Sequence, residues 1–543
     1  MNAFVKRVQN AVHRRRVHGW NNQRIRELAG KVASEAKGSD NARPVVMFNA
    51  STRLEGMSLN AAFQLLTGWS LRLVGAPVVQ FACQGGMKPC VLGTNRDNLD
   101  SPPPCERCTA QSRVLYTGAE VNWFRYQEYD DLAERLKGQD LDSLMSLEYQ
   151  GVPLGQLVLP SLRWILRRHH LMDDEATRKL IGNYMLSAWN IVQQFGALLD
   201  RVNPQSVVVF NGMFYPEAAA RWAAQKRGIR CISHEVGLHL FCGYFTNGEA
   251  TAYPIDIPHD FVMSPAQDKL LDDLLAERFK GNFSMAGIRF WPEMQPLSEE
   301  FWQRARQFKQ IVPVFTNVIF DTSQGHANVL YPHMFAWLAD VLEIIRTHPE
   351  TFFVIRAHPD ETRPGKASQE SVTDWVKARG VDQLSNVLYV DPDAYFSSYE
   401  LIAHSKFVMV YNSTIGLEAS LLGAAVLCGG KARFTQIPTV FFPDTAEAFR
   451  RQAQAFLSAD KVEALPEHRL NARRFLYYQV FRTSLPFNDY IREDGIWQGY
   501  VTLKDFELAQ LKPENSATLR TVVEGVLENK PFLLPDQTRG NLS

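Results

Sequence analysis

The stretch FVMVYNSTIGLEASLLGAAVLCGGKARF, residues 407–434, decides the fold of this chain. Residues 407–411 are an unbroken apolar run, which is typical of a parallel strand covered on both faces. A helix is predicted to follow, opening at 412–414 and ending at the glycine at position 423, and then a second strand at 425–428. The pattern predicts a strand–helix–strand unit of a parallel α/β sheet.

The start of this predicted helix is a candidate anion site. Asn412 and Ser413 are good N-caps, and the backbone N–H groups and dipole of a helix start favour a negative charge outside the strand end. Thr414 and Glu418 are four residues apart, so both can lie on one face of the helix. Taken alone, the pattern fits an ordinary capped helix of a structural unit equally well.

The totals describe a multi-domain chain without bulk charge. A length of 543 residues predicts two or more domains, and 45% hydrophobic with 21% charged residues is ordinary for a globular protein. Lys and Arg together number 58, as do Asp and Glu, so the chain has no bulk attraction for nucleic acid. No signal peptide and no apolar stretch of about 20 residues is evident. We therefore expect a cytoplasmic protein whose seven cysteines are reduced thiols or metal ligands.

Residues 1–43 are predicted to be a basic arm and a linker. The first 31 residues contain eight Lys or Arg and a single acid, Glu27. Residues 2–20 can form an amphipathic helix, and 34–43 read as a polar linker. The helix fits either an arm that lies on an anionic membrane surface or a solvated basic arm. Its apolar face would consist of Phe4, Val5, Val8 and Val12.

Residues 44–309 are predicted to form a Rossmann-like α/β domain. Short apolar runs alternate with helical patterns, an order that argues for a parallel sheet, and a mostly helical insertion is predicted at 115–200. Four polar residues fall at one edge of this sheet, where ligands bind in such folds. These residues are Asn211, Glu217, His234 and Glu235, and the predicted strands are 44–49, 77–81, 206–210 and 229–233.

Four cysteines lie within residues 83–108 of this domain, in the form C-x6-C-x14-C-x2-C. The last pair has the spacing of a metal knuckle, and four thiolates close a tetrahedral zinc site. An iron–sulfur cluster uses the same kind of ligands. No nearby histidine or spare carboxylate suggests a catalytic metal, so we expect a structural metal, with buried or incidental thiols as the alternative. The predicted ligands are Cys83, Cys90, Cys105 and Cys108.

Residues 310–445 are predicted to form a second Rossmann-like domain, followed by a helical, polar tail at 446–543. In a parallel sheet its strand ends point the same way. Three polar segments follow predicted strands, and their side chains are expected at one edge. These segments are 356–361, 391–399 and 412–418.

The histidine at position 358 is a second candidate ligand contact at this edge of the sheet. His358 and the helix start at Ser413 and Thr414 can hold a phosphate from two sides, and Glu418 can take the sugar hydroxyls of a nucleotide. His358 and Pro359 alone fit a solvent-facing turn. Only the combination predicts a nucleotide site.

Six motifs, three in each half of the chain, resemble one family. They are similar to motifs of bacterial capsule and surface-polysaccharide biosynthesis glycosyltransferases of GT-B architecture. That group is distantly similar to capsular Kdo transferases and to sialyltransferases with a His-Pro motif, and the resemblance covers roughly residues 44–445. The motifs are RAHP (356–359), YNSTIGLEASLLGAAVLCGG (411–430), FTNVIFDTS (315–323), YQGVPLG (149–155), VVVFNG (207–212) and HEVG (234–237).

The resemblance implies an α/β fold with two Rossmann-like domains facing across a cleft, here with an N-terminal helical arm and a helical C-terminal tail. It implies that His358 contacts the donor phosphate, with Ser413 and Thr414 binding it through the helix start, and it places Glu418 on the ribose. Phe434 departs from the family pattern, in which we expect Tyr in the donor loop. The expected donor-binding residues are Arg356, His358, Pro359, Asn412, Ser413, Thr414 and Glu418.

The resemblance also implies that the N-terminal domain supplies the base that deprotonates the acceptor hydroxyl. Glu235 is the first choice because it sits at a strand end, although a capping or salt-bridged acid fits there too. Such enzymes need no catalytic metal, and the chain lacks an evident Asp-x-Asp metal loop, since Asp391-Pro-Asp393 matches only in letters. The further candidates for the base are Glu217, His234 and Asp321.

These expectations combine into a metal-independent glycosyltransferase of hexosyl or ulosonosyl type. It would move a sugar from a nucleotide-sugar donor to a growing surface polysaccharide or lipid-linked glycan, with its basic arm at the inner face of the plasma membrane. One alternative is an epimerase, hydrolase or polyol-phosphate transferase of related fold. Another is a non-catalytic subunit of a polysaccharide assembly complex. No nucleic-acid partner is expected.

Overall fold

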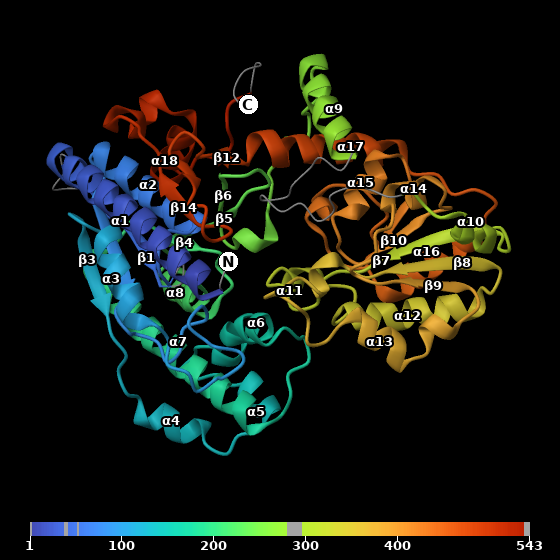
Figure 1. The fold of residues 1–543 in the computed structure, drawn as a ribbon, viewed down its shortest axis with the longest axis horizontal. Coiled ribbons are helices and arrows are strands. Elements are labelled where there is room, and N and C mark those ends of the chain that lie inside the picture. The colour runs from blue at the N-terminus through green and yellow to red at the C-terminus, as the bar shows by residue number, and fades with distance from the viewer. Residues whose placement is uncertain (1–2, 37, 39–41, 51–53, 280–295, 537–543) are drawn as a thin grey trace. The chain divides into compact units, whose positions relative to one another are not determined.

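The structure is a computed structural model that describes residues 3–36, 38, 42–50, 54–279 and 296–536. The chain divides into two units, coloured from blue to red along the sequence in Figure 1. The first unit consists of Met1–Ile165, Met172–Thr251 and Phe481–Ser543, and the second of Leu166–Leu171 and Ala252–Val480.

A seven-stranded sheet of order β12-β6-β5-β4-β1-β2-β3 forms the centre of the first unit. Strands β1 to β5 are parallel, and β6 and β12 run antiparallel at one edge. The order of the first five strands, 3-2-1-4-5, is that of a Rossmann fold. The strands are β1 Val45–Asn49, β2 Val78–Cys83, β3 Glu120–Phe124, β4 Ser206–Phe210, β5 Arg230–Val236, β6 Cys242–Asn247 and β12 Leu485–Pro486.

Helices cover this sheet, and most begin at a side-chain cap or at a proline. On one face α1 packs against α2 and α3, and α18 packs against α2, whereas α7 packs against α8 (Figure 1). Ser58 caps α2, and Asp174 caps α7 by accepting a hydrogen bond from the Thr177 N–H (2.8 Å). The helices are α1 Ala3–Glu35, α2 Leu59–Leu73, α3 Cys105–Leu115, α4 Asp130–Leu136, α5 Leu141–Met145, α6 Leu154–Leu166, α7 Glu175–Val202, α8 Tyr215–Gln225 and α18 Ala517–Glu528.

The N-terminal helix belongs to the core of this unit. It extends to Glu35, well beyond the predicted 2–20, and its second half buries Ile25, Leu28 and Val32. Of the predicted apolar face, Val12 is 54% exposed. The side chains at positions 4, 5 and 8 lie outside the described residues, as do positions 37 and 39–41 of the predicted linker. The arm is therefore anchored through its C-terminal half.

The second unit contains a fully parallel five-stranded sheet of order β11-β10-β7-β8-β9, again the Rossmann order 3-2-1-4-5. Helices α12 and α13 lie on one face, and α14 and α15 on the other (Figure 1). Figure 1 also labels α10 Glu299–Ala305 and α11 Gln324–Ala327. The strands are β7 Gln310–Phe315, β8 Thr351–Arg356, β9 Val387–Val390, β10 Val408–Val410 and β11 Val426–Cys428. The remaining helices are α9 Pro265–Phe279, α12 Met334–Thr347, α13 Val372–Ala378, α14 Ser398–Ala403, α15 Ile415–Leu421, α16 Ala446–Ser458 and α17 Pro466–Tyr477.

The unit boundaries differ from the predicted domain boundaries. The described residues of 252–309 lie with the second unit, and the predicted tail is divided, 446–480 with the second unit and 481–536 with the first. Arg473 of α17 pairs with Asp268 of α9 (2.9 Å), which ties the connecting region to the second unit. In the first unit β12 pairs with β6, and a hairpin of β13 (Ile491–Glu493) and β14 (Val501–Leu503) follows. Such long-range pairings leave no local pattern in the sequence.

The two Rossmann-order sheets, with helices near both termini, confirm the predicted α/β fold class with two Rossmann-like domains. None of the helices in the described part of the chain combines the length and apolarity needed to cross a bilayer.

Candidate functional site

The second unit has its topological switch point between β7 and β10. From β7 the chain proceeds through β8 to β9 on one side, and then crosses to β10 on the other. Ligands in such sheets bind outside the carboxyl ends of the strands at this crevice. The loops after the two strands meet there, because Nδ2 of Asn317 donates to Oδ1 of Asn412 (2.8 Å). The predicted segment 412–414 therefore lines the switch crevice.

Helix α15 begins at Ile415, slightly later than predicted. Thr414 is its N-cap residue but makes no side-chain capping bond, and Asn412 is engaged with Asn317 instead. A Cβ added to Gly416 would lie 3.0 Å from the Phe434 ring, so the ring packs directly on the first turn. Phe434 is 1% exposed and has no polar side-chain group to offer a ligand.

His358 follows β8 and caps a short turn. Its Nδ1 accepts a hydrogen bond from the Asp360 N–H (3.1 Å) at the start of the 3-10 turn Pro359–Glu361. Burial lowers the pKa of His358, and the nearby Arg356 acts in the same direction, whereas Asp360 and Asp321 act to raise it. The imidazole is therefore neutral near pH 7 and held by its own turn.

Charged side chains surround His358 within the second unit. Arg363 pairs with Asp360 (3.0 Å), and burial lowers the pKa of Lys366. Arg356 is 5% exposed, donates to the Phe396 carbonyl (3.1 Å), and has its pKa lowered by burial to about 10, so it stays charged. The group combines cations with two acids and a neutral histidine, a composition suited to an anionic ligand.

Glu418 makes a buried ion pair that the sequence did not predict. One carboxylate oxygen is bound by the Arg278 guanidinium, and the other accepts a hydrogen bond from the Tyr399 hydroxyl (2.5 Å). The Arg278 and Glu418 side chains are only 10% and 9% exposed. Burial acts to lower the pKa of Arg278, but Glu418 and Tyr399 outweigh it and the net shift is upward. In this structure Glu418 of α15 is engaged by Arg278 of α9, and its ribose contact stays a prediction.

The first unit has its own switch point, between β1 and β4, and Glu235 lies beside it on β5. Nδ2 of Asn211, directly after β4, donates to one carboxylate oxygen of Glu235 (2.8 Å). Nδ2 of Asn60 and the Val236 N–H donate to the other (3.3 and 2.8 Å). Glu235 is half-buried, so its carboxylate is oriented by three donors at an accessible strand end.

The other candidates for the base are placed less favourably. His234 is 0% exposed among the rings of Phe63, Phe210 and Phe245, its Nδ1 contacts Asn60 Oδ1 (3.1 Å), and burial lowers its pKa to about 3. Glu217 is 0% exposed on the inner face of α8.

Asp321 is exposed, but it belongs to the second unit, where its carboxylate accepts a hydrogen bond from the Ser323 N–H (2.8 Å). The geometry thus favours Glu235.

Three histidines that the sequence did not single out meet in the second unit. Ring nitrogens of His169, His170 and His333 lie within 4.8 Å of one another, as ligands of a metal ion would. Nδ1 of His170 contacts Oε1 of Glu370 (2.5 Å). The other carboxylate oxygen of Glu370 accepts hydrogen bonds from the backbone N–H groups of residues 169 and 170. Nδ1 of His333 accepts a hydrogen bond from the Ala336 N–H and thereby caps α12, which leaves the ring proton on Nε2. A metal ion bound at Nε2 would move that proton to Nδ1, and the helix cap would be lost. The arrangement already serves to dock segment 166–171 within its unit.

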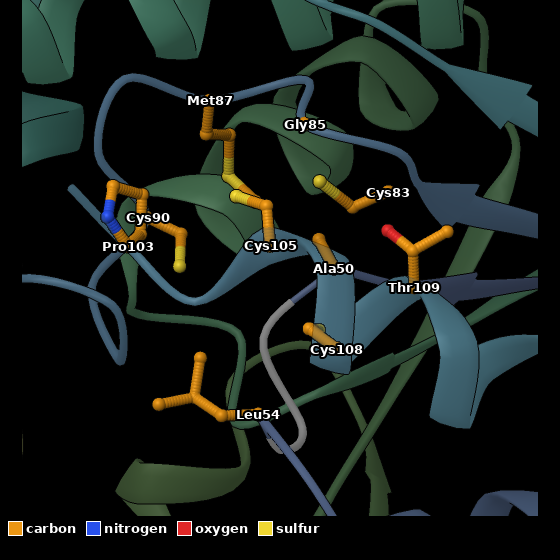
Figure 2. A pocket seen from close by; sticks show the side chains of 10 residues that line it. All are labelled: Ala50, Leu54, Cys83, Gly85, Met87, Cys90, Pro103, Cys105, Cys108 and Thr109. Atoms are coloured by element: carbon orange, nitrogen blue, oxygen red, sulfur yellow. The ribbon is translucent and has the colours of Figure 1, made fainter.

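The four predicted metal ligands of the first unit converge. Cys83, Cys90, Cys105 and Cys108 line one small cavity between the carboxyl end of β2 and the start of α3 (Figure 2). None of the four forms a disulfide.

The second unit is thus a Rossmann-type domain with polar side chains at its switch point. Residues 303–478, which include its whole sheet, match the family model described as "Capsule polysaccharide biosynthesis protein". The match confirms, for this segment, the resemblance to capsule polysaccharide biosynthesis proteins. No curated protein matches the chain.

Several solved structures are similar to the chain. The β-Kdo 2,4-transferase of KpsC from Thermosulfurimonas dismutans is 11% identical with a TM-score of 0.34, over 57% of this chain and 87% of that one. The β-Kdo 2,7-transferase of the same protein is 13% identical with a TM-score of 0.28, over 62% and 90%. A UDP-N-acetylglucosamine 2-epimerase is 12% identical with a TM-score of 0.25, over 93% and 100%.

Proposed function

We propose that this chain is a glycosyltransferase that moves a sugar from a nucleotide-sugar donor to a growing surface polysaccharide or lipid-linked glycan. One observation carries the proposal. The switch crevice of the second sheet, lined by Asn317 and Asn412, falls inside the segment that matches the capsule polysaccharide biosynthesis model. A nucleotide bound there has its phosphates at the carboxyl ends of β7, β8 and β10.

The donor residues divide into two groups in this proposal. Ser413 and Thr414 offer hydroxyls and backbone N–H groups at the crevice, and His358, Arg363 and Lys366 supply the polar wall beyond β8. Both groups face the leaving phosphate, whose negative charge grows as the glycosidic bond to it breaks. Arg356 and Pro359 support this wall, because Arg356 anchors to the Phe396 carbonyl and Pro359 opens the turn that His358 caps.

Glu235 acts as the base in this proposal. Its carboxylate accepts the proton of the acceptor hydroxyl, while the acceptor oxygen bonds to the anomeric carbon and the nucleotide departs with the bonding electron pair. The three donors that hold Glu235 orient the carboxylate, and no step requires a metal ion.

The test is transfer by full-length protein with a panel of CMP-, UDP-, GDP- and dTDP-sugars and a lipid-linked glycan acceptor. His358→Ala should lower transfer by about 100-fold or more, as expected for loss of a phosphate contact made in the transition state. The exposed His404 of the same unit provides the matched control, and His404→Ala should keep full activity. Full transfer by His358→Ala would refute the donor site.

The same panel separates the alternatives. Conversion of a nucleotide sugar without acceptor indicates an epimerase or hydrolase, and release of a polyol-phosphate product indicates a polyol-phosphate transferase. A thermal shift by one nucleotide without turnover on any acceptor indicates a non-catalytic subunit.

We also propose that the first half of α1 contacts anionic lipid. Arg15 and Arg16 are exposed, and so are Val12 and Trp20. Deleting the arm would remove core residues such as Ile25, so the suitable variant is Arg15→Glu/Arg16→Glu. It should co-sediment less with phosphatidylserine vesicles than the wild type, and equal binding would refute the contact.

A further inference from the structure

A long segment without helix or strand joins β2 to α3 in the first unit. Residues 84–104 have no regular structure, and segments of that length inside a compact unit usually carry a function. The segment is nevertheless tied down. The Lys88 N–H donates to Ser187 Oγ (2.9 Å), the Tyr215 hydroxyl donates to the Pro89 carbonyl (2.7 Å), and Asn190 Nδ2 donates to the Gly86 carbonyl (2.9 Å). Its path is set by α7 and α8.

The four cysteines stand at the two ends of this segment and within it. Cys83 is the last residue of β2, Cys105 is the first residue of α3, and Cys108 follows one helical turn later. All of them line the same cavity, with Cys90 reaching it from the middle of the segment (Figure 2). A bond from each sulfur to one centre would therefore close the segment against both the strand and the helix.

The backbone around the sulfurs favours negative charge. The Gly86 N–H donates to Cys83 Sγ (3.3 Å), and the Gly93 N–H donates to Cys90 Sγ (3.2 Å). The other pair lies in the first turn of α3, whose N-cap residue Pro104 makes no side-chain capping bond. Donated N–H groups and a helix N-terminus act to stabilise a thiolate, whereas burial raises the pKa of Cys83, Cys90 and Cys105 and favours the thiol in the absence of an ion. The sulfurs of Cys83 and Cys90 thus receive backbone N–H groups, and those of Cys105 and Cys108 lie at a helix start.

The cavity has the size of a single ion. Its volume is about 20 Å³, close to the room needed by one water molecule. The backbone approaches the sulfur closely, because a Cβ added to Gly93 would lie 2.9 Å from Cys90 Sγ and 2.6 Å from Pro103 Cβ. Apart from Thr109, the other side chains of the lining are apolar, as in a site shielded from water.

In this structure the four sulfurs stand farther apart than the ligands of a bound zinc ion. Within the described residues, only the histidine trio brings three ligand atoms within 4.8 Å of one another, whereas the sulfurs of a zinc tetrahedron lie roughly 3.8 Å apart. An ion would pull the cysteines inward across the cavity.

We propose that Cys83, Cys90, Cys105 and Cys108 bind one Zn²⁺ that fastens segment 84–104 between β2 and α3. Each thiol gives up its proton to solvent as its sulfur bonds to the ion, so four protons leave for each Zn²⁺ bound. Four sulfur ligands fill the coordination sphere, so the ion is structural and takes no part in group transfer.

The experiment measures metal on full-length protein purified without chelator. We expect about one zinc per chain by mass spectrometry of the metal, and loss of nearly all of it in Cys105→Ser/Cys108→Ser. Cys231→Ala, a buried cysteine of β5 that does not line the cavity, is the matched control and should keep its zinc.

Wild-type protein gives a second readout in case the double variant does not fold. Replacing zinc with Co²⁺ should produce the strong visible bands of a tetrahedral tetrathiolate site, and a mercurial thiol reagent should release the metal. Either response supports the proposal.

Three outcomes would overturn it: less than about half an equivalent of zinc, iron with acid-labile sulfide, or unchanged zinc in the folded double variant with loss in His170→Ala. Because the readout is bound metal, its failure is distinct from a failure of the proposed transfer activity.

Discussion

Glu361 ends the turn that His358 opens, and its carboxyl group makes the second unit sensitive to pH. It is 2% exposed, both of its oxygens accept from the Val372 N–H (3.1 and 3.2 Å), and burial raises its pKa from 4.5 to about 8. Because the folded state holds this proton more tightly than the unfolded state, the free energy of unfolding falls as pH rises from 4.5 and levels off above 8. At pH 7 the loss is about 3 kcal/mol, from about 1.4 kcal/mol per pH unit.

Glu361→Gln removes this titration and keeps an oxygen for the Val372 N–H. Relative to the wild type, its melting temperature should rise progressively between pH 4.5 and 8. A gain of about 3 kcal/mol corresponds to roughly 6–12 °C for a unit of this size. Thermal unfolding across that pH range is the assay, and the exposed Asp382 provides a control, since Asp382→Asn should run parallel to the wild type. Parallel curves for Glu361→Gln and the wild type would refute the reasoning.

Two further predictions concern buried charge. Arg278→Ala leaves the Glu418 carboxylate buried without its cation, so unfolding free energy should fall by about 3–5 kcal/mol, and adding Glu418→Gln should recover part of the loss. Denaturant titration measures both changes in unfolding free energy. If the change in the double variant equals the sum of the changes in the two single variants, the Arg278–Glu418 ion pair does not contribute. His234, whose pKa burial lowers from 6.5 to about 3, gives stability that is present above pH 6.5 and lost as pH falls toward 3, about 2 kcal/mol of it by pH 5. His234→Gln should flatten the acid limb of the stability profile, and an unchanged limb would show that His234 does not titrate there.

Local pattern was enough to predict most strands of both sheets, but not β3, which lies inside the predicted helical insertion at 115–200, nor the edge strands β6 and β12. The apolar runs at 45–49, 206–210 and 408–410 form buried parallel strands. A short run that is apolar at every position, between two helical segments, is typical of a strand covered by helices on both faces. The same logic placed Asn412 and Glu235 at the carboxyl ends of strands, where the structure has them.

Other features depend on contacts between residues far apart in the sequence. Nothing in the local sequence signals that Arg278 meets Glu418, that His333 meets the pair at 169–170, or that β12 joins β6. Helix α1 shows the same limit. The basic pattern of its first half predicted a surface arm, whereas its second half packs into the core of the first unit. Pattern alone predicts elements and strand ends, whereas partners require the folded chain.

The return of the chain to the first unit sets an order of folding during synthesis. The second unit takes almost all of its residues from 252–480, so it can close while the ribosome is still making the remainder. The first unit cannot, because its core includes Leu485, Leu503 and Val522. Until those residues emerge, β6 presents an unpaired sheet edge and α2 lacks its cover from α18. The N-terminal half of this protein is made first and finished last, and in that interval it is the part of the chain most in need of a chaperone.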